Sequence, residues 1–157
     1  MFRVARGGVT RYYLVDYKTL WVGDDGELSA NRTHLGHYLP QSLRSVMNTH
    51  LYHLQSHLYQ VAINRLLRQR LGDVYQPQLH FGGALYLFLR GMAGEASRVV
   101  INGVDHGSAG VYIHRPPHRV TELLSLALEN PSRAEQALSD LFEGLSRMKQ
   151  RSSEWGV

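Results

Sequence analysis

The sequence predicts an α/β or α+β layer fold, in which one long helix packs across a β-sheet. Two strongly apolar runs of β-forming residues, 12–18 and 80–91, lie on either side of a long helical pattern. Strands separated by a helix of this length are typical of such layers. We assign residues 1–150 to a single domain and residues 151–157 to a frayed tail.

Composition narrows the class of protein. The chain has 157 residues, of which 43% are hydrophobic and 19% charged, as in an ordinary soluble globular domain. It has no cysteine, which excludes disulfides and thiolate metal sites and is compatible with the cytoplasm. No apolar run approaches the roughly 20 residues that span a bilayer, so we expect no membrane partner. The net charge of +4, carried mostly by arginine, permits a nucleic-acid partner.

A β-hairpin is predicted at the N-terminus. Two β-like runs flank Gly7 and Gly8, and glycines suit the positive φ of a tight hairpin turn. The second run, from Tyr12, should be a strand buried on both faces. Side chains two apart share a face, so Asp16 and Lys18 should project to the same side.

An acid beside a base at the end of a strand suits metal-assisted phosphodiester hydrolysis. The Asp16 carboxylate would hold a hard cation, and the Lys18 ammonium would orient the attacking water and offset phosphate charge. The alternative is a plain surface ion pair, which an isolated Asp-x-Lys favours. We interpret the nearby Asp24, Asp25 and Glu27 as solvated loop residues and not as metal ligands.

Helical spacing of apolar residues predicts one helix over about 40–71, opened by Pro40 and ended before Gly72. Gln55 and Tyr59, four apart, should share a face. Three histidines, His50, His53 and His57, also fall on one face of this helix. They could bind zinc, but the pattern has no coordinating acid, so we favour partly buried or DNA-facing roles.

The remaining chain alternates extended and helical segments. Residues 80–91 should form a central strand, with Gly82 and Gly83 marking a bulge or a close backbone approach. A short edge strand is predicted at 98–101, and an extended piece at 110–115 must stop at the following prolines. Thr121 should cap a helix to about residue 129, and another helix should restart at 130–131 and continue to about 148.

Three segments, taken in order, resemble one family. They are the run from Tyr12 through Gly23, the run Leu54–Tyr59, and the run His80–Gly91. They look like the C-terminal nuclease domain of RecB, the β subunit of exodeoxyribonuclease V in the helicase-nuclease RecBCD. The resemblance covers about residues 11–117 and includes Gly110-Val111-Tyr112 followed by Arg115-Pro116. Each motif alone is weak, and the ordered set is specific.

The resemblance implies a fold, a chemistry and partners. The fold would be a partial PD-(D/E)XK, restriction-endonuclease-like core with a mixed sheet flanked by helices. The activity would be magnesium-dependent DNA cleavage in recombination and double-strand-break repair, with RecC- and RecD-like subunits or the helicase part of RecB as partners. Asp16 matches a metal-binding aspartate, the Tyr17 carbonyl a further Mg²⁺ ligand, and Lys18 the catalytic lysine. Gln55 and Tyr59 match the family's Gln-x-x-x-Tyr motif beside the active site.

One departure from the family pattern bears on activity. The family's first metal-binding aspartate would lie just before Met1, and Asp16 is the sole carboxylate in the first 23 residues. Magnesium keeps its waters and binds loosely to a single carboxylate, so we expect weak or absent cleavage by this chain alone. Three readings therefore stay open: part of a RecB-type nuclease, an inactive nuclease fold that binds DNA or docks on a partner, and a basic domain unrelated to nucleic acids.

Overall fold

The protein is described from a computed structural model that covers residues 1–23, 33–137 and 139. The chain forms two compact units, Met1–Pro116 and Pro117–Val157. The expectations for Asp24, Asp25 and Glu27, for the helix beyond residue 139 and for the tail 151–157 lie outside the described residues.

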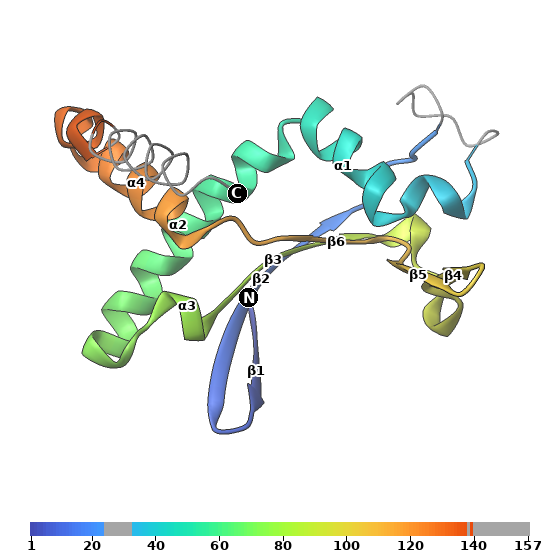
Figure 1. The fold of residues 1–157 in the computed structure, drawn as a ribbon, viewed down its shortest axis with the longest axis horizontal. Helices are drawn as coiled ribbons and strands as arrows, with labels where there is room; N and C mark the ends of the chain where they lie inside the picture. The colour runs from blue at the N-terminus through green and yellow to red at the C-terminus, as the bar shows by residue number, and fades with distance from the viewer. Residues whose placement is uncertain (24–32, 138, 140–157) are drawn as a thin grey trace, which may run out of the picture. The chain divides into compact units, whose positions relative to one another are not determined.

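A four-stranded mixed sheet organises the first unit (Figure 1). Its strand order is β1-β2-β3-β6, formed by β1 (Phe2–Arg6), β2 (Val9–Lys18), β3 (Phe81–Phe88) and β6 (Val111–His114). The pairs β1·β2 and β3·β6 are antiparallel, whereas β2·β3 is parallel. The mixed α/β fold is therefore confirmed, and it is consistent with a restriction-endonuclease-like core.

The predicted N-terminal hairpin is present, but its burial differs from the prediction. Gly7 and Gly8 adopt φ of 59° and 77°, as a tight turn requires. Strand β1 is exposed along its whole length, and Tyr17 of β2 is 64% exposed. The expectation that β2 is buried on both faces is wrong, because in the described structure only one face of the sheet meets the helices α1 (Pro40–Thr49) and α2 (Tyr52–Leu71). A run of apolar residues does not reveal which of its faces is covered.

Gly82 and Gly83 mark a close backbone approach, as the sequence predicts: Gly82 faces Tyr13 of β2, and Gly83 faces His114 of β6. The pairing register shifts between Tyr12 and Tyr13, which marks an irregularity in the parallel ladder. A Cβ at Gly82 would lie 2.1 Å from the Tyr13 ring, so this position admits no side chain. Gly83 has φ of 110°. The close approach sets the register that pairs Asp16 with Tyr86.

The predicted helix 40–71 is in fact two helices, α1 (Pro40–Thr49) and α2 (Tyr52–Leu71). They are separated at Leu51, which adopts φ 54° and ψ 26° in the left-handed region. No proline or glycine marks the break, so the apolar periodicity runs through it without a signal. Gly72 ends α2 with φ 57°, as predicted.

Both helices pack on the face of the sheet that carries Asp16 and Lys18. One core joins Leu43 and Met47 of α1 to Tyr86 and Phe88 of β3. A second, smaller core joins α2 to Phe81 near the start of β3. Burial of these side chains orients the helices toward the carboxyl end of β2.

Short elements complete the first unit. The predicted strand at 98–101 is present as β4 (Arg98–Ile101), and it pairs antiparallel with β5 (Val104–Ser108) in a separate two-stranded sheet. The short elements are η2 (Leu35–Tyr38), η3 (Gly72–Val74), α3 (Pro77–His80), η4 (Leu89–Gly91), η5 (Gly94–Ser97), β4 (Arg98–Ile101) and β5 (Val104–Ser108). Strand β6 ends before the prolines, as expected.

The second unit begins with α4 (His118–Glu129), whose N-cap residue is Pro117. The prediction that Thr121 caps this helix is wrong, since Thr121 lies inside the helix and is 4% exposed. The predicted restart is confirmed: residues 131–137 are helical, and the Arg133 amide donates to the Asn130 side-chain oxygen at 3.2 Å. Across the described residues, every helix is too short or too polar to cross a membrane.

Candidate active site

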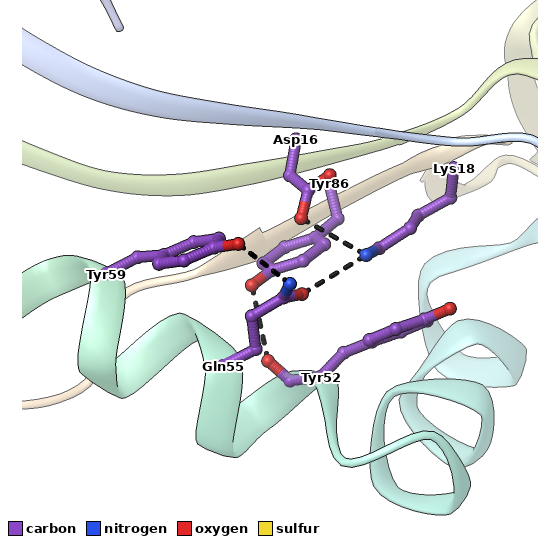
Figure 2. A network of polar contacts seen from close by, with 6 residues as sticks. All are labelled: Asp16, Lys18, Tyr52, Gln55, Tyr59 and Tyr86. Atoms are coloured by element: carbon purple, nitrogen blue, oxygen red, sulfur yellow. Dashed lines mark hydrogen bonds and ion pairs between the residues drawn. The ribbon is translucent and has the colours of Figure 1, made fainter.

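Asp16 and Lys18 project from the end of β2 toward α2, as their spacing predicts (Figure 2). The Lys18 Nζ lies 3.1 Å from the Asp16 Oδ2. Their side chains are only 11% and 20% exposed, respectively. The pair is thus largely shielded from water, which strengthens its electrostatic interaction relative to an exposed pair.

Gln55 and Tyr59 of α2 extend this pair into a connected set (Figure 2). The Lys18 Nζ donates to the Gln55 Oε1 at 3.1 Å, and the Gln55 Nε2 donates to the Tyr59 hydroxyl at 2.9 Å. We call Asp16, Lys18, Gln55 and Tyr59 the Lys18 cluster. The structure brings together all four predicted catalytic side chains, from a strand and a helix that are distant in the chain.

Two tyrosines that the sequence reasoning did not assign to the site also hold Lys18. Its Nζ lies 3.7 Å from the centroid of the Tyr52 ring and 5.5 Å from that of Tyr86, both within cation–π range. The Tyr86 hydroxyl donates to the Tyr52 carbonyl at 3.2 Å. In sequence, Tyr86 is one aromatic in an apolar strand, and only its register opposite Asp16 marks it.

Burial raises the pKa of Tyr86 to about 12, although a side-chain hydrogen bond with Ser56 opposes this effect and the Asp16 charge adds to it. The Tyr86 phenol therefore stays protonated at neutral pH. It acts as a neutral hydrogen-bond donor beside the cation and not as a base.

The metal ligands that the family resemblance implies are the Asp16 carboxylate and the Tyr17 backbone carbonyl. One Asp16 oxygen already pairs with Lys18. Among the described residues, no group of three histidines or carboxylates is placed to hold a metal ion. Magnesium takes six ligands in near-octahedral geometry, so these donors do not by themselves form a magnesium site.

The predicted face of three histidines is split by the break between the helices. His50 stacks on Tyr52 with ring centroids 5.3 Å apart. His53 and His57 instead meet His114 of β6, at centroid distances of 4.7 and 4.9 Å. We call His53, His57 and His114 the His114 cluster; the grouping with His50 was wrong because the helix changes direction at Leu51.

The His114 cluster is biased toward its neutral form. Burial, followed by repulsion from His53 and His57, lowers the pKa of His114 to about 4. Burial is also the main cause that lowers the pKa of His53 and of His57. The His114 Nδ1 lies 2.8 Å from the Ser56 hydroxyl, a geometry that suits a neutral ring.

Curated proteins similar to this chain share one name. RecBCD enzyme subunit RecB of Escherichia coli (strain K12) is 40% identical over 106 residues, which is 68% of this chain and 7% of that subunit. RecB of Mycolicibacterium smegmatis is 39% identical over 120 residues, which is 76% of this chain and 10% of the subunit. The resemblance to RecB is confirmed.

The match to RecB is local. The chain spans about a tenth or less of the length of these RecB subunits. RecB of Mycobacterium tuberculosis (strain ATCC 25618 / H37Rv) shows the same relation, with 40% identity over 119 residues. No protein-family model matches the chain. The similarity is consistent with a RecB nuclease-domain fragment.

Proposed function

We propose that this chain forms part of the nuclease site of a RecB-type exodeoxyribonuclease that cuts DNA with magnesium. The observation that carries the proposal is the Lys18 cluster: the four side chains that match the family motifs form one connected set, in which Asp16 and Gln55 contact the Lys18 ammonium and Tyr59 contacts Gln55. Similarity to RecB supports the same assignment.

Lys18 is the chemical centre of this proposal. Asp16 and Gln55 each accept from its ammonium, and the Tyr52 ring closes a further side. A cation held in this way is preorganised to stabilise the negative charge that develops on a phosphate during cleavage. Tyr59 positions Gln55, and the low exposure of the pair keeps bulk water from screening the interaction.

Magnesium and the partners follow from the same proposal. Asp16 supplies one carboxylate, so further acidic ligands must come from residues outside the described part or from another segment of a RecB subunit. DNA would be the substrate, and RecC- and RecD-like subunits would complete the assembly. By this account the chain alone cuts DNA weakly or not at all.

A segment exchange tests the proposal. The matched segment of E. coli RecB is replaced by the corresponding residues of this chain, and RecBCD containing the hybrid is assayed for degradation of linear DNA with Mg²⁺. We expect degradation by the hybrid and its loss when the hybrid carries Asp16→Ala. Retention of cleavage with Asp16→Ala would refute the assignment.

A second candidate function is an inactive nuclease fold that binds DNA or docks on a partner. The observation that favours it is the single carboxylate in the described site. A hybrid that assembles with RecC and RecD but leaves linear DNA intact, together with DNA binding by the isolated chain, would favour this alternative.

A further inference from the structure

A pocket of about 250 Å³ lies between α1 and the segment that follows β2, and its lining begins at Leu20, two residues after Lys18. The segment contributes Trp21, and α1 contributes Ser45 and Thr49 to the lining. His50 also lines the pocket, at the end of α1. Sites for drug-sized ligands measure about 300–1,000 Å³, so this pocket suits a single small ring system.

The pocket wall formed by the segment after β2 is held in place by Tyr38 and Arg90, which do not belong to the Lys18 cluster. The Tyr38 hydroxyl donates to the Leu20 carbonyl at 3.3 Å and accepts from the Val22 amide at 3.2 Å. The Arg90 guanidinium lies 3.8 Å from the Trp21 ring centroid, and its Nε donates to the Thr19 carbonyl at 2.6 Å. The indole is therefore fixed before any ligand arrives, which lowers the entropic cost of binding.

A continuous series of aromatic contacts links the pocket to the candidate active site. His50, in the pocket lining, stacks on Tyr52, and the Tyr52 ring lies 3.7 Å from the Lys18 Nζ. A phosphate bound at Lys18 would thus be separated from the pocket lining by the Tyr52 ring, which contacts both Lys18 and His50.

The lining chemistry matches a nucleobase. The indole of Trp21 and the imidazole of His50 line the pocket with flat rings, although Arg90 lies over one face of the indole and Tyr52 stacks on one face of the imidazole. The hydroxyls of Ser45 and Thr49 can donate or accept hydrogen bonds. The described lining residues include no carboxylate, and Arg90 adds a cation nearby. Such a site tolerates the polyanionic backbone that a base brings with it.

We propose that this pocket receives one unstacked base of single-stranded DNA, next to the nucleotide whose phosphate lies at Lys18. The proposal rests on the proposed nuclease function, since it takes the Lys18 cluster as the phosphate site. It adds a subsite that holds one base, beside the site for the phosphate.

Trp21 provides a direct optical test. The chain has 2 tryptophans, and a Trp155→Phe variant of the full chain leaves Trp21 as the sole indole. A short thymidine oligonucleotide is titrated without divalent metal, so that binding is measured apart from cleavage. We expect quenching of Trp21 fluorescence and an affinity roughly tenfold higher than for an abasic oligonucleotide of equal phosphate count.

Pocket filling supplies an independent test. Ser45→Phe should place a ring in the pocket and reduce the affinity for the thymidine oligonucleotide roughly tenfold, while affinity for the abasic oligonucleotide stays unchanged. Asn48→Phe is the matched control, because Asn48 is exposed on the same helix and does not line the pocket. Circular dichroism of both variants checks that they fold.

The outcomes separate the pocket from the nuclease assignment. Equal affinity for thymidine and abasic oligonucleotides, without Trp21 quenching, would overturn the pocket while leaving the Lys18 cluster as a phosphate site. Failure of the chain to bind either oligonucleotide would overturn the pocket and also count against the nuclease assignment. The comparison of the two oligonucleotides uses the unaltered pocket, so it decides the question even if Ser45→Phe fails to fold.

Discussion

Helix α2 carries parts of two polar clusters that lie against the same face of the sheet, and they balance charge in opposite ways. In the Lys18 cluster a cation meets a carboxylate and an amide oxygen, and the Tyr52 ring lies against the same cation. In the His114 cluster three bases face one another, and burial keeps them neutral. The first arrangement preserves a charge that a phosphate can use, whereas the second removes charge to allow close packing.

The two clusters are joined through Ser56. Its hydroxyl lies 2.8 Å from the His114 Nδ1 and accepts from the Gln60 Nε2 at 3.0 Å. It also shares a hydrogen bond with the Tyr86 phenol beside Lys18. Substitutions on each side therefore show how far the clusters act independently.

The largest expected contrast is in catalysis. In the RecB hybrid described above, Lys18→Met should slow DNA cleavage on the order of 10²–10⁴-fold, because it removes the charge that would stabilise the phosphate transition state. His114→Asn, which keeps a polar partner for Ser56, should change the rate less than about threefold. Cleavage assays under single-turnover conditions measure both, and similar losses would show that the clusters form one functional unit.

The second-largest expected contrast is in the response to acid, because lowering the pH should destabilise the protein through the His114 cluster. The folded-state pKa of His114, about 4, lies below its usual value of 6.5, so the unfolded chain takes up the proton first. The His114 contribution to the free energy of unfolding is therefore present above pH 6.5 and is lost as the pH falls toward 4. After allowance for partial exposure, we expect a loss of about 1–2 kcal/mol.

The His114→Asn variant separates the acid effect of His114 on stability from that of the carboxylates, which titrate in both proteins. Urea unfolding of the wild type and of His114→Asn is compared at pH 7 and pH 4.5. The difference between the two proteins should shrink or reverse at the lower pH. A difference that does not depend on pH would mean that His114 is not held neutral by its neighbours.

Loss of the Tyr86 hydroxyl, which links the two clusters through Ser56, should have a smaller effect on the free energy of unfolding. Tyr86→Phe removes the hydrogen bonds to the Tyr52 carbonyl and to Ser56, which should lower the free energy of unfolding by about 1 kcal/mol. A double-mutant cycle with Ser56→Ala measures their coupling, for which we expect at least about 0.5 kcal/mol. Strict additivity would show that the clusters are separate.

The smallest expected effect on the free energy of unfolding comes from Leu51, where the break between α1 and α2 separates His50 from His53 and His57. Leu51 is 66% exposed and adopts a left-handed conformation, so Leu51→Gly should relieve strain and stabilise the protein by about 0.5–1 kcal/mol. Leu54→Gly is the control, because Leu54 is also exposed but lies within α2, where glycine should destabilise by about 1 kcal/mol. Thermal unfolding of both variants should give shifts of opposite sign; shifts of the same sign would indicate that Leu51 is not strained.

Much of the site was predictable because its geometry is local. The two-residue period of a strand places Asp16 beside Lys18, and the four-residue period of a helix places Gln55 beside Tyr59. The glycine pair at 82–83 likewise predicted a close backbone approach, and the Tyr13 ring does lie against Gly82. The family resemblance connected these local pairs, since spacing alone could not bring β2 and α2 together.

The parts that failed prediction depend on contacts between distant segments. The sequence by itself determined the hairpin, the central strand, the end of α2 at Gly72, and the two local pairs Asp16/Lys18 and Gln55/Tyr59. Tertiary structure alone decided the break at Leu51 and the grouping of His53 and His57 with His114 and not with His50. It also decided which face of β2 is exposed and which contacts Tyr52 and Tyr86 make with Lys18. The physical reason is that periodicity reports the backbone of one segment, whereas burial and pKa depend on which other segments pack against it.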